Sequence, residues 1–571
     1  MKARLSRWQQ ALDEGQLDAF LGQVYGGEAI GEWKRHYAQA LGLFAESYGT
    51  EGEVVIARCP GQMNLMGMHI DYGGMPSVRL AVRGSDTLTV ARANDDGVVR
   101  LRSHIEYPGE RADRFEPFTL ALSDIVPGEN VGTRADFMRY AGRICQQRLE
   151  EKGSAQDNHW SVLVGGQLVY LESYFRARQA FCGMDAVVWS NVSPSGGMSS
   201  SSALVISTAC AALGANDLQP RVDLPESDLV DGVGTSEWIR GTRGGTADHG
   251  GMVMGRSGQL VGVGVFPAVA TGSATLPEEY VALVLDTGVP RVYDDAVKEE
   301  TVVAYPLGTF VVRDLLLPEL AGAGPFASMP PDWRARIEMI RDISEETLHI
   351  GPQAIYQLLR VLPAVTSLRA MADQADSQGK GDAFAEMYAR EIEGKFQALT
   401  DDSPIYLRRR FAFGLAEQDR VRYVLDYLER GDMATALELA RISHLGDFDR
   451  EVEVDELDRL SRSVDEGDER GRLCFLPGGY GRMTPEYDLA VRRVNEYLIE
   501  TGGLLAGSLQ RLGAGWGGNM GGLIHRDYIY GPQRVHFERF LVEELGIDTP
   551  LERCVAVPGE GAGLVSLPAE S

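Results

Sequence analysis

The sequence is poor in cysteine, in basic charge and in long apolar runs, and each shortage excludes a class of protein. Six cysteines occur among 571 residues and none forms a Cys-x-x-Cys pair, so we expect reduced thiols and neither a zinc site nor a disulfide framework. The 55 lysines and arginines stand against 82 acidic residues, for a formal charge of −27, which argues against a nucleic-acid surface. No apolar run approaches the roughly 18 residues of a membrane span, and the N-terminus lacks a signal-peptide core. We therefore expect a cytoplasmic protein without a membrane partner.

The remaining composition predicts a large protein of mixed secondary structure. The length exceeds the ~100–200 residues usual for one domain, and a hydrophobic content of 44% supports more than one core, so we expect two or more lobes. Apolar residues recur at helical spacing near the N-terminus, and short β-branched runs alternate with helical patterns up to about residue 265. We expect strands at residues 162–164, 186–190, 505–525 and 553–567, and helices at 333–348, 352–373, 381–399, 416–430 and 486–501.

Residues 58–74, RCPGQMNLMGMHIDYGG, combine glycines with polar side chains in one short stretch. Glycine permits positive φ and close approach of the backbone to a ligand. Asn64, His69 and Asp71 add hydrogen-bonding groups of the kind that a polyhydroxylated ligand needs. An ordinary glycine-rich loop has a similar composition, so the stretch alone leaves both interpretations open.

Residues 193–204, SPSGGMSSSSAL, run directly into the apolar segment 205–213. This pattern predicts a phosphate-binding loop at the start of a buried helix, because glycines bring backbone N–H groups close to an anion and the helix N-terminus adds partial positive charge. A serine hydroxyl in such a loop can reach a phosphate-bound metal. No Gly-Lys-Ser/Thr follows, so this is not a Walker loop. A flexible Ser/Gly linker is the alternative, although the apolar continuation argues against it.

A third glycine cluster, LGAGWGGNMGGLI at residues 512–524, predicts a tight turn between two strands, with a functionless bulged hairpin as the alternative. In their order and separation, the three segments resemble the three signature motifs of the GHMP kinases. The first is similar to the motif of the galactokinase branch, Pro-Gly-Arg-x-Asn-Leu-Ile-Gly-Glu-His-x-Asp-Tyr-x-Gly-Gly. Residues 60–74 match that pattern with departures at Gln62 and Met68. The resemblance covers most of residues 50–571, including stretches at 80–84, 94–100, 237–249, 420–424, 443–449 and 558–563.

The resemblance implies an α/β (α+β) fold with two lobes and an active site in the cleft between them. Residues 1–48 would form a helical N-terminal extension outside the resemblance. Residues 49–270 would form the N-terminal lobe, a mixed β-sheet with helices that carries the sugar and ATP loops. Residues 271–571 would form a helix-rich C-terminal lobe with an antiparallel sheet and an inserted helical and loop region around 300–350. We expect a monomer or a homodimer.

The resemblance also implies which residues bind and react. Asp248 would be the catalytic base beside the anomeric hydroxyl of the sugar, and Gln62 stands where the family has a catalytic arginine. The implied ATP-binding residues are Ser195, Gly196, Gly197, Met198, Ser199, Ser200 and Ser201. Mg²⁺, a hard cation that prefers oxygen ligands, would be held by Ser200, Ser201 and Glu237. The sugar would contact Met68, His69, Asp71, Gly245 and Gly515.

Three of these side chains also have a purely structural interpretation. Asp248 would serve equally as the N-cap of a helix, and Glu237 as an exposed helix residue. A lone histidine is more often structural than ligand-binding, but the nearby Asp71 favours a ligand contact for His69. The spacing between Glu237 and Asp248 is one residue shorter than in the family.

Two departures from the family motif bear on activity and substrate. Gln62 keeps hydrogen-bonding groups but removes a permanent positive charge, so the pKa of the base would be less depressed and the developing charge less stabilised. Arg243 or another basic residue would have to compensate, or catalysis would be weaker. Met68 replaces a glutamate that contacts the hydroxymethyl end of the sugar in galactokinases, and methionine offers at most a weak acceptor. A site with this change should favour galactose less strongly.

We therefore expect an ATP- and Mg²⁺-dependent sugar 1-kinase. Its expected substrate is a galactose-configured sugar altered at C6, such as L-arabinose, a 6-deoxy sugar or a uronic acid, or galactose itself. Gln62 keeps open a second interpretation, a kinase-derived regulator that binds sugar but has lost turnover. A third, a GHMP kinase of a non-sugar alcohol, is disfavoured by His69 and Asp71.

Overall fold

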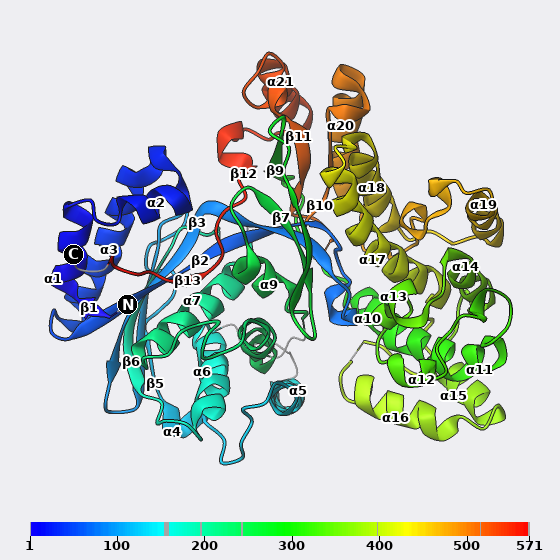
Figure 1. Cartoon of the computed structure of the whole chain (residues 1–571), viewed down its shortest axis with the longest axis horizontal. Helices are drawn as coiled ribbons and strands as arrows, with labels where there is room; N and C mark the ends of the chain where they lie inside the picture. Colours follow the sequence, from blue (N-terminus) through cyan, green and yellow to red (C-terminus); the bar gives the residue numbers. More distant parts are fainter. Residues whose placement is uncertain are drawn as a thin grey trace. The chain divides into compact units, whose positions relative to one another are not determined.

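The computed structural model describes residues 2–152, 159–193, 197–240, 244–396, 398–513 and 515–568, and the chain divides into two compact units (Figure 1). Unit 1 comprises Met1–Asn64, Arg79–Leu276 and Ala556–Ser571, and unit 2 comprises Leu65–Val78 and Pro277–Val555. Both units are discontinuous in the sequence, whereas the ranges expected from the sequence are continuous. The first glycine-rich motif is divided between the two units at Asn64 and Leu65.

Unit 1 is built on a mixed sheet. Within the described residues it has nine strands in the order β1-β2-β3-β6-β4-β5, with β13 paired to β2 and β7 paired to β3 and β8. Strands β3 and β6 are antiparallel, and β4 and β6 are parallel. The bounds are β1 Ala3–Arg4, β2 Glu53–Met66, β3 Ser77–Asn94, β4 Val98–Ile105, β5 Phe118–Ala121, β6 Gly183–Ser190, β7 Gln259–Gly264, β8 Val269–Thr275 and β13 Gly563–Leu564.

Both faces of this sheet are covered by helices, which explains why its strands are apolar at successive positions. On β2, Val54 and Ile56 pack into one core, whereas Val55 and Ala57 pack into the other. This alternation follows from the two-residue period of a strand. The first core contains α1 Leu5–Asp13, α2 Asp18–Tyr25 and α3 Ile30–Tyr48 (blue in Figure 1). The second contains residues of α5 Arg134–Lys152, α6 Ser161–Phe175, α7 Ser200–Ala215 and α9 Ala247–Met254, beside the short α4 Leu122–Ile125 and α8 Val233–Thr235.

The strand expected at residues 162–164 is wrong, because these residues lie in α6. Helix α6 is apolar on nearly all sides, and its buried residues run from Leu163 to Leu171 without a break. A short apolar run in such a helix has no helical period that distinguishes it from a buried strand. The strand expected at residues 186–190 is confirmed by β6.

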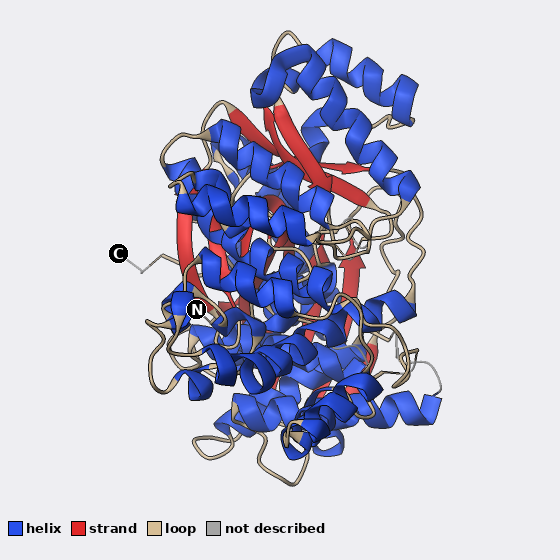
Figure 2. Ribbon diagram, turned by 90° about the vertical axis from the view of Figure 1, so that its right-hand side faces the viewer, coloured by secondary structure: helices blue, strands red, loops and turns tan. Residues whose placement is uncertain are grey.

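Unit 2 contains a four-stranded sheet with the order β10-β11-β9-β12. Strands β10 Gly507–Arg511 and β11 Asn519–His525 form an antiparallel hairpin, which confirms the turn predicted at the third glycine cluster. Strand β11 also pairs antiparallel with β9 Tyr280–Asp286, and β12 spans Val555–Ala556. Side chains from α20 Pro485–Gly502 and α21 Arg534–Leu545 complete the core of this sheet. Figure 2 shows the strands in red among the more numerous helices in blue.

The other helices of unit 2 match the sequence expectations in part. The helices expected at residues 416–430 and 486–501 are confirmed by α17 and α20. The one expected at 352–373 is instead two helices, because Leu362 precedes Pro363 and takes an extended conformation, as residues before proline prefer. The one expected at 333–348 is reduced to short turns. The bounds are α10 Asp295–Phe310, α11 Leu317–Leu320, α12 Trp333–Arg336, α13 Glu345–Leu348, α14 Pro352–Val361, α15 Leu368–Ser377, α16 Gly381–Glu391, α17 Leu407–Glu429, α18 Met433–Gly446 and α19 Val454–Asp465.

One helical segment, Asp295–Leu320, is long and apolar enough to span a membrane by length and composition alone. Its most apolar window is 72% buried inside the structure. Burial of this extent is what the core helix of a water-soluble protein shows.

Candidate active site

The serine-rich loop ends at the N-terminus of α7, as the sequence predicts. Gly197 has a φ of 72°, and Ser199 is the N-cap of the helix in the left-handed region, with a φ of 56°. Ser200 and Ser201 lie in the first turn and are partly exposed. The N–H groups of a first helical turn have no partner within the helix, so this end favours an anion. Ser195 and Gly196, which the sequence analysis also assigned to ATP binding, lie outside the described residues, as does Arg243.

Asp248 lies in the first turn of α9, where its carboxylate contacts side chains from two other segments of unit 1. The N-cap of α9 is Thr246, so Asp248 does not cap the helix. The Ser199 hydroxyl donates a hydrogen bond to Asp248 Oδ2. Gln62 on β2 donates from Nε2 to Ser199 Oγ at 3.1 Å. The structure thus brings together Gln62, Ser199 and Asp248, which the sequence assigned to the site separately.

Arg79 on β3 completes this cluster, and the sequence analysis missed it. Its Nη1 donates to Gln62 Oε1 at 2.9 Å and also to Asp248 Oδ1. The Arg79 side chain is 4% exposed and that of Asp248 is 37% exposed. Four side chains therefore form a closed ring of hydrogen bonds, from Arg79 to Gln62, to Ser199, to Asp248 and back to Arg79.

This ring determines the charge of Asp248. Burial alone would raise the pKa of the carboxyl, but the Arg79 guanidinium and the Ser199 hydroxyl outweigh burial and lower that pKa below its usual range. Opposite charge and hydrogen bonds to the ionised form both favour the carboxylate. Asp248 is therefore ionised near neutral pH, and its partial exposure leaves it open to a ligand.

Glu237, the predicted metal ligand, meets Ser202 rather than Ser200 or Ser201. Ser202 Oγ on α7 donates to Glu237 Oε1 at 3.0 Å. His249 Nε2 lies 3.2 Å from the same oxygen, and the Glu237 side chain is 24% exposed. The structure records no contact between Glu237 and either earlier serine among the hydrogen bonds and ion pairs of the described residues.

The oxygen atoms of Glu237 and Ser202 suit Mg²⁺. Among the described residues, no group of three or more His, Cys, Asp or Glu side chains is arranged to hold a metal. Mg²⁺ in phosphoryl-transfer sites typically takes only one or two carboxylates and completes its six ligands with water and substrate phosphates. One partly exposed carboxylate beside a hydroxyl at the N-terminus of α7 fits that requirement.

The sugar-motif residues Met68, His69 and Asp71 belong to unit 2. Met68 is buried, at 1% exposure. Asp71 is partly exposed and begins a 3₁₀ turn, where its Oδ1 accepts a hydrogen bond from Tyr72 N at 3.1 Å. Gly67 has a φ of 87°, and a Cβ there would lie 2.7 Å from Ser77 Cα, so only glycine fits.

His69 is buried and lies between two arginines. Its ring stacks on Tyr480 with centroids 4.9 Å apart. Arg511 Nε donates to His69 Nε2 at 3.3 Å, and Arg482 Nη1 lies 3.5 Å from Nδ1. Burial lowers the pKa of His69 to about 4; Asp447, 3.6 Å from Nε2, opposes this and the two arginines add to it. The ring is therefore neutral at physiological pH.

Two buried carboxylates support this motif from α17 and α18. Glu417 accepts from Gly67 N at 2.9 Å and from Arg420 Nε at 2.5 Å. Asp447, the C-cap of α18, forms an ion pair with Arg511, in which Oδ2 lies 2.5 Å from Nε. Burial would raise the pKa of each carboxyl, but the neighbouring arginines lower it below its usual range. Both groups are therefore charged, and each is matched by an arginine.

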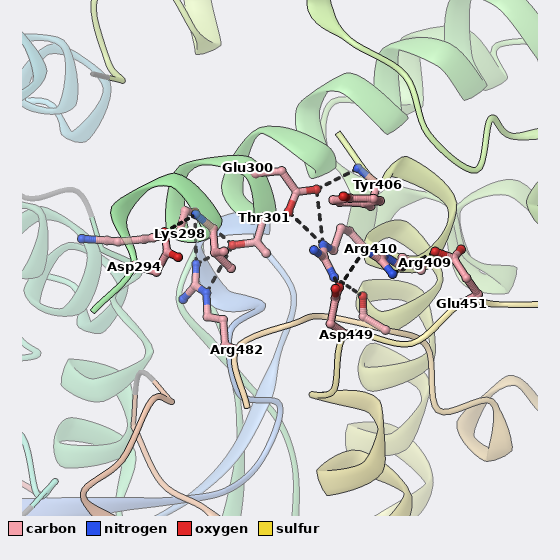
Figure 3. A network of polar contacts seen from close by, with 12 residues as sticks. Asp294, Lys298, Glu300, Thr301, Tyr406, Arg409, Arg410, Asp449, Glu451 and Arg482 are labelled. Atoms are coloured by element: carbon pink, nitrogen blue, oxygen red, sulfur yellow. Dashed lines mark hydrogen bonds and ion pairs between the residues drawn. The ribbon is translucent and has the colours of Figure 1, made fainter. Parts of the chain in front are cut away.

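Arg482 connects the sugar motif to the third glycine cluster. Its Nη2 donates to Thr301 Oγ1 on α10 at 2.7 Å and to the Lys298 carbonyl at 3.2 Å (Figure 3). The guanidinium also lies 5.0 Å from the Trp516 ring centroid. A Cβ on Gly515 would lie 2.7 Å from the Arg482 carbonyl oxygen. Gly515, a predicted sugar contact, thus allows the turn to pack on the Arg482 backbone.

A second ion-pair network fixes the neighbouring helices of unit 2. Arg410 on α17 donates from Nε to Glu300 on α10 at 3.0 Å and from Nη1 to Asp449 at 3.0 Å (Figure 3). Arg409 extends the network to Glu451 at 2.8 Å. Because the buried arginines are paired and hydrogen-bonded, this network holds α10 against α17, and α10 carries the contacts of Arg482.

Three residues that the sequence analysis missed share one property. Arg79, Arg482 and Arg511 are buried arginines, and a buried charge is rare without a partner. Arg79 stands in the otherwise apolar run VRLAV at residues 78–82, which was a signal for a buried partner. Gly245, predicted to contact the sugar, is partly exposed in the turn before α9.

Parts of the chain match known families and proteins. Residues 42–92 match the family model described as the galactokinase galactose-binding signature, and residues 164–256 match the GHMP kinases N-terminal domain. Galactokinase of Candida parapsilosis is 25% identical over 229 residues, which is 40% of this chain and 39% of that protein. Galactokinase of Candida maltosa is 22% identical over 228 residues, 40% of this chain and 91% of that protein.

A solved structure extends the comparison to nearly the whole chain. The crystal structure of Lactococcus lactis galactokinase complexed with galactose aligns with a TM-score of 0.55 at 16% identity, over 91% of this chain and 97% of that one. The fold is therefore that of the GHMP kinases. Over about two fifths of its length the chain is similar to galactokinases, and its two matched family regions carry the galactose-binding signature and the GHMP kinases N-terminal domain. The matched region spans about two fifths of the length of the Candida parapsilosis enzyme.

Proposed function

We propose that this protein is an ATP-dependent sugar 1-kinase that phosphorylates the anomeric hydroxyl of a monosaccharide. The observation that carries the proposal is the Asp248 carboxylate, which is ionised, partly exposed and hydrogen-bonded to Ser199 at the N-terminus of α7. A proton acceptor beside an anion-binding helix end supplies two of the groups that phosphoryl transfer needs.

The proposed reaction proceeds through one proton transfer and one phosphoryl transfer. Asp248 accepts the proton of the sugar O1 hydroxyl while O1 forms a bond to the γ-phosphorus of ATP. The bond from that phosphorus to its bridging oxygen breaks, and ADP leaves with the electron pair. The backbone N–H groups at the start of α7 stabilise phosphate charge, and Ser199 keeps the carboxylate in place.

Mg²⁺ would be held by Glu237 with a serine of α7. The bound ion would screen the charge of the phosphates and orient them. The contact with Glu237 favours Ser202 as that serine, while the assignments of Ser200 and Ser201 remain predictions. Exchanging Glu237→Gln should raise the Mg²⁺ concentration that half-saturates ATP binding, as measured by calorimetry.

The proposed substrate is a galactose-configured sugar altered at C6, such as L-arabinose, a 6-deoxy sugar or a uronic acid, with galactose as the comparison. The basis is Met68, an apolar and buried side chain where the galactokinase motif carries glutamate. The test is ADP release by the purified protein with Mg²⁺ and ATP over a panel of aldoses and uronic acids, with the product identified by NMR. Binding of a sugar without turnover would support the regulator instead.

Met68→Glu should shift preference towards galactose. A carboxylate restores a strong acceptor for a 6-hydroxyl, and it would repel a uronate. A hydrogen bond to a charged group contributes roughly 1.5–3 kcal/mol, so the ratio of kcat/KM for galactose to that for the best substrate should rise by about one to two powers of ten. Met68→Gln is the matched variant that adds an acceptor without charge. An unchanged ratio in both folded variants would show that position 68 does not set this preference.

A further inference from the structure

We propose that Arg79 supplies the positive charge that the galactokinase motif carries at the position of Gln62, and that it thereby positions and ionises the catalytic base Asp248. This inference rests on the proposed sugar-kinase function. It assigns a positioning role to Arg79 on β3. Strand β3 is adjacent to β2, which carries Gln62.

The Arg79 guanidinium contacts both Asp248 and Gln62. Nη1 of Arg79 donates to Asp248 Oδ1 and, at 2.9 Å, to Gln62 Oε1. Gln62 therefore accepts a hydrogen bond from the guanidinium with its side-chain carbonyl oxygen and donates one to Ser199 from its amide nitrogen. An arginine at position 62 has no acceptor to offer Arg79, and two guanidinium groups would repel each other. Gln62 and Arg79 are thus compatible neighbours, because the neutral amide on β2 accepts from the cation on β3.

The surroundings of Arg79 make room for it and leave it little freedom. A Cβ on Gly251, one turn after Asp248 on α9, would lie 3.0 Å from Arg79 Cδ and 3.1 Å from its Cβ. Because Gly251 has no side chain, the aliphatic part of Arg79 packs against this face of α9. With 4% of its side chain exposed, the guanidinium is poorly screened by water, so its attraction to Asp248 is stronger than that of a surface pair.

The groups facing Asp248 identify Arg79 as its main cation. They are Arg79 from β3 and the hydroxyl of Ser199, the N-cap of α7, with His249 next to Asp248 on α9. Of these, only Arg79 carries a permanent charge. Its field lowers the pKa of Asp248 more than the Ser199 hydrogen bond or His249 does, and burial opposes all three.

The test relocates the charge. Arg79→Gln should lower kcat roughly 10²-fold, the loss typical for removal of one preorganised electrostatic group, with little change in KM for ATP or sugar. The acid limb of the kcat profile should move to higher pH, because an unpaired Asp248 protonates more easily. The double variant Arg79→Gln/Gln62→Arg restores the arginine of the motif and should recover at least tenfold of the lost kcat.

Arg83→Gln is the matched control, since Arg83 lies four residues further along β3 and its Nη2 donates to Ser257 Oγ at 2.6 Å. It should leave kcat and the pH profile unchanged. Arg79→Lys keeps the charge and should retain more activity than Arg79→Gln. In an active enzyme, wild-type kcat in Arg79→Gln, or a folded double variant no better than the single one, would overturn the inference. Lack of turnover by the wild-type protein on every sugar would instead overturn the proposed function, and with it the catalytic role of Arg79.

Discussion

The chemistry proposed for Asp248 is set by the atoms that its carboxylate contacts. One oxygen accepts from Arg79 and the other from Ser199, so both contacts favour the ionised form. A carboxylate so paired is a weak base in isolation. A weak base is sufficient for phosphoryl transfer, because the proton of the acceptor hydroxyl is removed while the bond from its oxygen to phosphorus forms.

Asp248→Asn should abolish most turnover and spare ATP binding. The amide keeps the size of the side chain but cannot accept the proton, and general base catalysis contributes typically 10²–10⁴-fold. The measurement is kcat at saturating sugar, with ATP affinity from calorimetry. Asp217→Asn is the control, since the Asp217 side chain is 81% exposed. If kcat is retained, Asp248 is not the base; if only ATP affinity falls, its role is structural.

At the scale of residues, the sequence predicted the groups that stand in recognisable motifs and missed those that meet them from elsewhere. Gln62, Ser199 and Asp248 were each assigned to the site, and the structure brings them together. Arg79 lies on a strand outside the serine loop and the aspartate segment, so no spacing rule connects it to Asp248. The sequence analysis assigned Ser200 and Ser201, the neighbours of Ser202, to the metal site. The rotation of α7 about its axis determines which of these serines faces Glu237, and the sequence alone does not give that rotation.

At the scale of elements, α7 shows what a buried helix needs from its first turn. From Ser202 to Ala215 nearly every residue is buried, so the helix is held by packing on all sides, and only its N-terminus offers free N–H groups. The left-handed Ser199 and Gly197 turn the chain into this end. The loop could be read from its composition, whereas its conformation depends on α9 and β2, which hold Ser199 through Asp248 and Gln62.

Gly197→Val should weaken ATP binding more than sugar binding. A β-branched residue is strained at a φ of 72° and would push the loop away from a phosphate that the backbone must approach closely. The measurement is calorimetric affinity for ATP and for sugar separately. Gly97→Val is the matched control, because Gly97 has a φ of 68° and its Cβ would meet no atom within 4 Å. Unchanged ATP affinity in folded Gly197→Val would show that the loop is a linker.

Elements were predicted best where one period dominated their sequence. Helix α20 and strand β6 were found because their apolar positions or β-branched runs are clear. Helix α6 was mistaken in part for a strand, since a helix buried on all sides has no polar face to reveal its period. The helix expected at 352–373 was broken by Pro363, a stop signal that the sequence analysis passed over.

At the scale of the whole molecule, the N-terminal extension is part of the core of unit 1. Trp8, Leu12, Leu17 and Leu21 are buried with residues of β2 and β6 in one cluster. The extension therefore covers a sheet face that would otherwise be an exposed apolar surface. Its helical spacing was visible in the sequence, but the face that it covers was not, because the resemblance to the family begins only after it.

Trp8→Ala should destabilise the protein without changing KM. Trp8 is 0% exposed, and its Nε1 donates to the Val54 carbonyl at 3.2 Å. Removing a buried tryptophan typically costs about 3–5 kcal/mol, which urea unfolding would measure. Phe20→Ala, at a partly buried position of the same extension, should cost less. A loss below that of Phe20→Ala would contradict the assignment of Trp8 to the core.

The acid stability of the protein should depend on His69. Its pKa in the folded state is about 4, below the ordinary value of 6.5, so between these values the unfolded chain binds the extra proton. The stability that neutral His69 contributes is therefore present above about pH 6.5 and is lost as the pH falls towards 4. Between pH 7 and pH 5 this loss amounts to about 2 kcal/mol.

His69→Asn removes the titrating ring and suits the left-handed φ of 65°, which asparagine tolerates better than most residues. Urea unfolding of both proteins at the two pH values isolates the ring, because the other titrating groups are common to both. The variant should lose less stability on acidification than the wild type, even if its stability at pH 7 is lower, and an equal loss would show that His69 is protonated at the same pH in the folded and unfolded chains.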